Sequence, residues 1–207
     1  SVPLGIATAA YIAEVASPGI KKILKPVVEI LAGIPSVVIG FLGIVVLGPI
    51  IADIFNLSNG QNAVNASILL AIMSLPTIIS LSEDAISAVP KDYKNASLGL
   101  GANRWQTLIK VVIPSSLSGI IASIMLGMGR AIGETMTVLM ATGNAPALPD
   151  SIFDSVRTMT ATIAIELGEV PYNTTHYYSL FAVGLILFIM TFVVNLISDI
   201  ILHKYQE

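Results

Sequence analysis

The chain has 207 residues, of which 55% are hydrophobic and only 11% are charged, and its mean hydropathy is +0.86. Soluble domains carry about 25% charged residues, so this composition excludes an ordinary soluble domain. A net charge of -3 gives no basic surface for nucleic acid, and the lack of Cys excludes disulfides and thiolate metal sites. We therefore predict an all-α integral membrane protein.

Apolar segments of membrane-spanning length follow one another along the chain. A hydrocarbon core of roughly 30 Å needs about 20 helical residues. Residues 2–15 are apolar but too short, and we expect them to be the second half of a span whose first half precedes this sequence. Residues 27–51 and 64–81 are two further candidates, and 177–202 is the last. Residues 111–142 are apolar for longer than a straight crossing requires, so we expect this segment to tilt, bend or extend beyond the hydrocarbon.

Basic residues predict which connections face the cytoplasm. Eight of the ten Lys and Arg residues lie in three stretches, namely Lys21, Lys22, Lys25, Lys91, Lys94, Arg104, Lys110 and Lys204. The positive-inside rule makes these stretches cytoplasmic. The connections at residues 52–63 and 143–176 contain a single basic residue between them, Arg157, so we expect these connections to face outside. The sequence thus predicts about five spans, a cytoplasmic loop at 82–110 and an outer loop at 143–176.

The cytoplasmic loop carries small residues at a specific spacing. Ala96 and Ser97 permit close approach of another helix, and Gly101 permits a sharp change of direction. The pattern consists of Asn95, Ala96 and Ser97, then Gly101, and it continues past the loop into the next apolar segment with Val111, Ile113 and Pro114. This spacing resembles the EAA loop of ABC importer permeases, with Asn in place of Glu and Ser in place of the second Ala. In that family the loop is a short coupling helix that docks on the ATPase; an ordinary solvated turn is the alternative.

Further blocks resemble the phosphate-specific (Pst) permeases, and in particular their PstC subunit type. The blocks are residues 29–38, 72–77, 129–136, 141–144, 157–160 and 165–167. The resemblance implies a single ABC importer permease domain over residues 1–207, truncated at its N-terminus. Its fold would be a type I-like helical bundle in which the first of six family spans is missing.

The resemblance also implies a function and partners. The chain would be a permease subunit of an ATP-driven inorganic phosphate importer, forming half of the pathway in a bacterial or archaeal cytoplasmic (inner) membrane. Its partners would be a PstA-like second permease subunit, a PstB-like ATPase dimer, a PstS-like extracytoplasmic phosphate-binding protein and membrane lipid. The sequence lacks a G-x-x-x-x-G-K-[ST] pattern, so we expect ATP and Mg on the partner ATPase and no cofactor in this chain.

Three other classes stay open at this point. A permease for another oxyanion, such as sulfate or molybdate, would have the same architecture. A passive anion channel would not need an ATPase-docking loop. An intramembrane enzyme would need a nucleophile and a base at membrane depth, and the sequence has neither an H-E-x-x-H nor a G-x-S-x-G pattern. We therefore predict a transport subunit without catalytic or metal-binding residues.

Arg130 and Glu134 are the candidate substrate-pathway residues. A charge inside a membrane span costs a few kcal/mol or more, so an intramembrane Arg indicates function. A spacing of four residues would place both side chains on one helix face. The guanidinium matches two phosphate oxygens, and Glu134 would keep the anion from binding too tightly. An ion pair that only fixes helix packing is the alternative.

Charged residues in the outer loop are candidates for docking the binding protein. They are Arg157, Glu166 and Glu169, and an ordinary solvated surface is the alternative. Residues 151–169 have helix-like apolar content, so we expect a helix there. Glu29, four residues after Lys25, predicts an ion pair between these two side chains near the membrane interface.

Overall fold

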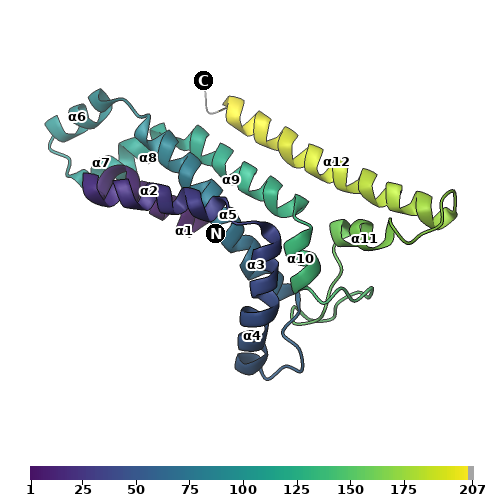
Figure 1. Ribbon diagram of the computed structural model, residues 1–207. Helices are drawn as coiled ribbons and strands as arrows, with labels where there is room; N and C mark the ends of the chain where they lie inside the picture. The colour runs from purple at the N-terminus through teal and green to yellow at the C-terminus, as the bar shows by residue number, and fades with distance from the viewer. Residues whose placement is uncertain (205–207) are drawn as a thin grey trace. The chain divides into compact units, whose positions relative to one another are not determined.

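The computed structural model describes the backbone of residues 1–204, and all their side chains except those of 198 and 201–204. Lys204, which we counted among the basic residues, therefore has its side chain outside the described part. The regular elements of the described chain are helices (Figure 1), with η denoting π-helical segments. In order they are α1 (Val2–Ala10), η1 (Tyr11–Val15), α2 (Pro18–Ala32), α3 (Ser36–Leu42), η2 (Gly43–Leu47), α4 (Gly48–Phe55), α5 (Ala63–Ser87), α6 (Lys91–Gly99), α7 (Arg104–Thr107), η3 (Leu108–Val112), α8 (Ile113–Ser115), α9 (Leu117–Gly133), α10 (Met136–Ala141), α11 (Met159–Glu166) and α12 (Thr175–Lys204).

Three of the described helical stretches are long and apolar enough to cross a membrane. They are Ser36–Phe55, Ala63–Ser87 and Thr175–Ile197. Arg104–Ser115 and Leu117–Gly133 meet at an angle of 68° and would make a fourth if the bent pair is one span. The predicted spans at 64–81 and 177–202 are therefore confirmed as helices, as is the bend within 111–142.

The predicted span at 27–51 is wrong in its boundaries. α2 ends at Ala32, and the next helix begins only at Ser36, after Pro35. Proline has no N–H to donate to the preceding turn, and it disfavours helical geometry in the residue before it, so the helix stops here. The membrane-length stretch is Ser36–Phe55, and the lysines that we placed in a connection lie in α2.

The chain divides into two compact units, each with its own core. The first unit comprises Ser1–Gly33, Ser74–Gly129 and the end of the chain from Val194. Its apolar core joins the first helix, α5, η3 and α9 through Ala9, Ala10, Ile86, Val89, Leu108, Val112 and Ile120. A smaller cluster of Ile12, Val28 and Ile79 holds α2 in place.

The second unit comprises Ile34–Met73 and Arg130–Val193. Its core consists of Ile39, Ala66, Leu69, Met73, Val138 and Ala141. α3 lies beside α10 (Figure 1), and Gly40 permits this close approach. A Cβ at Gly40 would lie 3.1 Å from the Cα of Thr137 and 3.0 Å from the sulfur of Met140. This packing fixes α10 within the unit.

Candidate coupling and transport sites

The predicted coupling loop forms a hairpin of two helices, α6 and α7. α6 carries Asn95, Ala96 and Ser97 and ends just before Gly101, whose φ of +87° lies in the region that favours glycine. A Cβ at Gly101 would have open space around it, so the backbone angle, not crowding, favours glycine. The predicted change of direction at Gly101 is therefore confirmed.

The second arm of the hairpin begins with a capping box. The side chain of Asn103 accepts the N–H of Gln106 at 2.8 Å, and the side chain of Gln106 accepts the N–H of Asn103 at 2.9 Å. Two otherwise unpaired N–H groups are satisfied in this way, which fixes the start of α7. Pro114 lies in the first turn of the short helix α8, as expected, and the 68° bend follows at Ser116.

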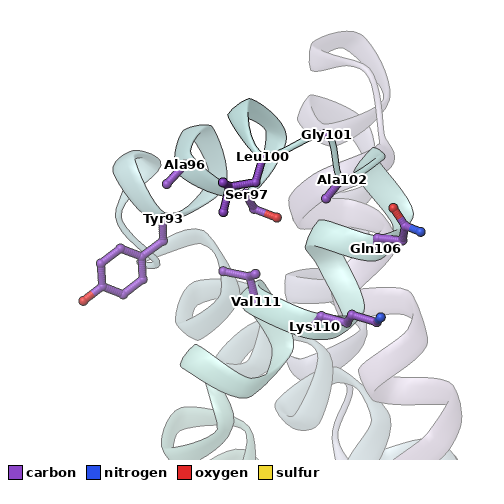
Figure 2. A pocket seen from close by; sticks show the side chains of 9 residues that line it. All are labelled: Tyr93, Ala96, Ser97, Leu100, Gly101, Ala102, Gln106, Lys110 and Val111. Atoms are coloured by element: carbon purple, nitrogen blue, oxygen red, sulfur yellow. The ribbon is translucent and has the colours of Figure 1, made fainter.

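The hairpin and the following segment η3 line an open hollow of about 630 Å³ (Figure 2). It is lined by Tyr93, Ala96, Ser97, Leu100, Gly101, Ala102, Gln106, Lys110 and Val111. Large apolar side chains stand exposed on the same hairpin, with Leu100 90% and Trp105 65% exposed. These two side chains are available for contact with a partner.

The helix that carries Arg130 is broken one turn later. α9 ends at Gly133, and α10 begins at Met136, so the prediction that Arg130 and Glu134 share one continuous helix face is wrong. A carboxylate oxygen of Glu134 instead accepts the N–H of Thr137 at 3.1 Å. Glu134 thereby satisfies a free donor at the start of α10, which a mid-helix Glu would not meet.

The break is also held from α11. The hydroxyl of Thr160 donates to the main-chain carbonyl of Glu134 at 2.9 Å. The hydroxyl of Thr137 donates to the carbonyl of Ser36, at the start of α3, at 3.1 Å. The hydrogen bond from Thr160 supplies a partner where the end of α9 leaves a carbonyl free, as membrane helices require. The hydrogen bond from Thr137 joins the start of α10 to the start of α3.

Two of the outer-loop candidates are paired with each other. A guanidinium nitrogen of Arg157 lies 2.7 Å from Glu166, and its Nε donates to the carbonyl of Asn144 at 3.0 Å. The other oxygen of Glu166 lies 2.7 Å from His176 Nε2, at the start of α12. Glu169 is exposed, in the turn after α11. The predicted helix at 151–169 is shorter than expected, because only Met159–Glu166 is helical.

Among the ion pairs of the described residues, the most buried carboxylate was not one of our candidates. Glu83 is 3% exposed and accepts from Lys21 at 2.6 Å, Lys25 at 2.8 Å and Ser87 at 2.9 Å. Lys25 also contacts Asp84 at 2.9 Å, so the predicted Lys25–Glu29 pair is wrong. The hydrogen bonds to Glu83 and then Asp84 raise the pKa of Lys25 above its ordinary value, although burial opposes them. The four-residue spacing of the two lysines was the available signal.

These features define a polytopic α-helical membrane protein with a polar helical hairpin between two apolar stretches and a broken helix that carries charge. The chain belongs to the binding-protein-dependent transport system inner membrane component family, whose sequence model matches residues 1–206. The predicted resemblance to this class of permease is thereby confirmed.

Named relatives refine the family assignment. The probable ABC transporter permease YqgH of Bacillus subtilis is 42% identical over 93% of this chain and 62% of its own length. The phosphate transport system permease PstC of Mesorhizobium japonicum is 36% identical, covering 99% of this chain and 68% of the relative. PstC of Haemophilus influenzae is 32% identical, covering 100% and 71%. The chain thus spans about two thirds of these relatives.

A solved structure shares the fold. The MetNI methionine ABC transporter, in an inward-facing conformation, superposes with a TM-score of 0.72 at 19% identity. The match covers 98% of this chain and 85% of the other. The predicted fold class, an all-α ABC importer permease, is therefore confirmed.

Proposed function

We propose that the chain is the permease subunit of an ATP-driven inorganic phosphate importer of the inner membrane. The observation that carries the proposal is the similarity to PstC proteins, at 32–36% identity over essentially the whole chain. A second, PstA-like permease would complete the pathway, and a PstS-like binding protein would deliver phosphate outside. ATP and Mg would act on a PstB-like ATPase dimer, because this chain has no P-loop pattern.

The α6–α7 hairpin is the proposed docking site for the ATPase. Asn95, Ala96 and Ser97 would present the helix, Gly101 would fix the turn, and Pro114 would begin the helix that receives the movement. The exposed Leu100 and the hollow beside it support this assignment, because an apolar side chain at 90% exposure gains most when a partner covers it.

Arg130 and Glu134 are the proposed pathway residues, with separate tasks. Arg130 would bind phosphate oxygens through its planar fork. Glu134, whose side chain meets the start of α10, would fix the break that leaves this part of the chain irregular. Broken helices at membrane depth are tolerated where they are buried in protein or line a water-filled cavity, which supports a transport role for the break.

The outer segment 143–176 is the proposed surface for the binding protein. Arg157 and Glu166 would act through their mutual ion pair, which holds α11 against the loop that precedes it. Glu169, which is exposed, would contact the partner directly.

Transport assays with the complete complex test the function. The complex is reconstituted in vesicles with labelled phosphate and the loaded binding protein. We expect uptake that requires ATP and is not competed by excess sulfate or molybdate. Competition by either oxyanion would favour the alternative substrate, and uptake without ATP would indicate a passive channel.

A further inference from the structure

The coupling helix α6 is tied at two points to elements that share one core. The ammonium of Lys94 in α6 forms an ion pair with Glu14 in η1, 80 residues earlier in the chain. On the same helix, the hydroxyl of Ser97 lies 3.0 Å from that of Thr107, at the end of α7. α6 is thus held to two separate segments by side chains one turn apart.

The ion pair is partly shielded from water. The side chains of Lys94 and Glu14 are 20% and 21% exposed, whereas Lys91 and Asp92 on the same helix are exposed. Solvent screening weakens ion pairs least where the charges are partly buried, so this contact is stronger than an ordinary surface pair. It borders a hollow of about 480 Å³ that also contains Arg104 and Trp105.

The two ties end on helices that pack together. Glu14 belongs to η1, which directly continues α1, and Thr107 directly precedes η3. Ala9 and Ala10 of α1 share one buried cluster with Leu108 and Val112 of η3 and with Ile120 of α9. Since packed cores transmit displacement rather than absorbing it, a shift of α6 would move these helices together.

We propose that Glu14 and Lys94 form a positioning contact that transmits the movement of the coupling helix to the first helix of this chain. This inference rests on the proposed function, because it assigns the internal contact through which ATPase-driven motion reaches the membrane helices. Neither residue belongs to the spacing on which the coupling loop was recognised. The Ser97–Thr107 contact, which uses the Ser that stands in place of the second Ala, provides the parallel tie to η3.

The test compares the ratio of phosphate transported to ATP hydrolysed in the reconstituted complex. Glu14→Gln and Lys94→Gln should each lower this ratio at least threefold while the protein level and co-purification with the ATPase stay near wild type. The charge-exchanged double variant, Glu14→Lys with Lys94→Glu, should recover most of the ratio. Lys22→Gln, which removes an exposed lysine charge from α2, outside the docking hairpin, is the control and should behave as wild type.

Each other outcome has a distinct meaning. Wild-type ratios in both single variants would overturn the positioning role. A defect in Lys94→Gln but not in Glu14→Gln would overturn it as well, because Lys94 would then act on the ATPase directly. A charge-exchanged variant as poor as the single variants would contradict the ion pair as the working contact. A wild-type complex without ATP-driven phosphate uptake would instead overturn the proposed function.

Discussion

The hydroxyl of Thr160, in α11, donates a hydrogen bond of 2.9 Å to the main-chain carbonyl of Glu134, in the break between α9 and α10. α11 lies in the outer segment, and Glu134 is a proposed pathway residue. The contact therefore connects, within one unit of the chain, the segment proposed to receive the binding protein and the break proposed to line the route of phosphate.

Removing that hydroxyl should loosen the break. Thr160→Val keeps the side-chain shape but leaves the partly buried Glu134 carbonyl without this donor, which costs about 1 kcal/mol, less than for a fully buried carbonyl. We expect a lower thermal unfolding temperature and faster amide exchange in residues 134–137. Thr160→Ser retains the hydroxyl and should stay close to wild type. Equal behaviour of the two variants would show that the hydrogen bond contributes nothing.

The turn at Gly101 should be required for coupling. Gly101→Val places a β-branched residue at φ +87°, which costs about 1–2 kcal/mol, so the α6–α7 turn should change shape. We expect normal amounts of the variant in the membrane, with ATP hydrolysis uncoupled from uptake. Gly101→Asn, which tolerates left-handed geometry better, should retain more transport. Normal phosphate uptake by the Val variant would contradict the proposed role of this turn in coupling.

Arg130 should respond to loss of its planar fork. Arg130→Lys keeps the charge but loses bidentate geometry, and we expect substantially lower phosphate uptake at a near-normal protein level. Near-normal uptake by Arg130→Met would make us withdraw the phosphate site.

Two substitutions of Glu134 distinguish the role of its charge from its role as the acceptor at the start of α10. Glu134→Gln keeps an oxygen that can accept the Thr137 N–H, whereas Glu134→Leu loses it and should lower stability by about 1 kcal/mol. Thermal unfolding of both variants measures the capping contribution, and their uptake rates measure the charge. If Leu is no less stable than Gln, the cap has no energetic role.

Glu83 should contribute to the free energy of unfolding. Glu83→Leu leaves Lys21 and Lys25 without their buried acceptor, and we expect a loss of about 1–3 kcal/mol. This is less than for a fully buried pair, because both lysines are more than one third exposed. Asp84→Asn, at a position whose side chain is 58% exposed, is the control and should cost less than about 1 kcal/mol. Thermal unfolding in detergent gives both values.

Orientation in the membrane can be measured directly, because the chain has no Cys of its own. A thiol reagent that cannot cross the bilayer should label Asn59→Cys and Asp150→Cys in intact cells. Lys91→Cys should react only in inverted vesicles. All three positions are exposed, so access to the reagent depends on the side of the membrane. External labelling at position 91 would overturn the predicted topology and the ATPase-docking proposal with it.

Local sequence patterns determined much of this protein. Composition indicated the membrane class, because a hydrocarbon environment demands apolar residues over whole helices. The apolar segments at 64–81 and 177–202 are helical in the structure. Gly101 lies at the predicted turn, where the backbone has a positive φ that favours glycine. These features depend on residue types within one segment of the chain, so they can be predicted from the sequence alone.

Tertiary structure decided where charges find partners and where helices stop. Lys25 has Glu29 one turn away, yet it binds Glu83, 58 residues distant, because packing of α2 brings the buried carboxylate closer to its ammonium. Arg157 and Glu166 were separate candidates until α11 brought them within 2.7 Å. The i, i+4 spacing predicted one helix face for Arg130 and Glu134, but α9 ends at Gly133. Beyond this end, the Glu134 carboxylate accepts the N–H of Thr137, and the Thr160 hydroxyl donates to the Glu134 carbonyl. Such choices depend on distances between segments far apart in the chain, which spacing along the sequence does not encode.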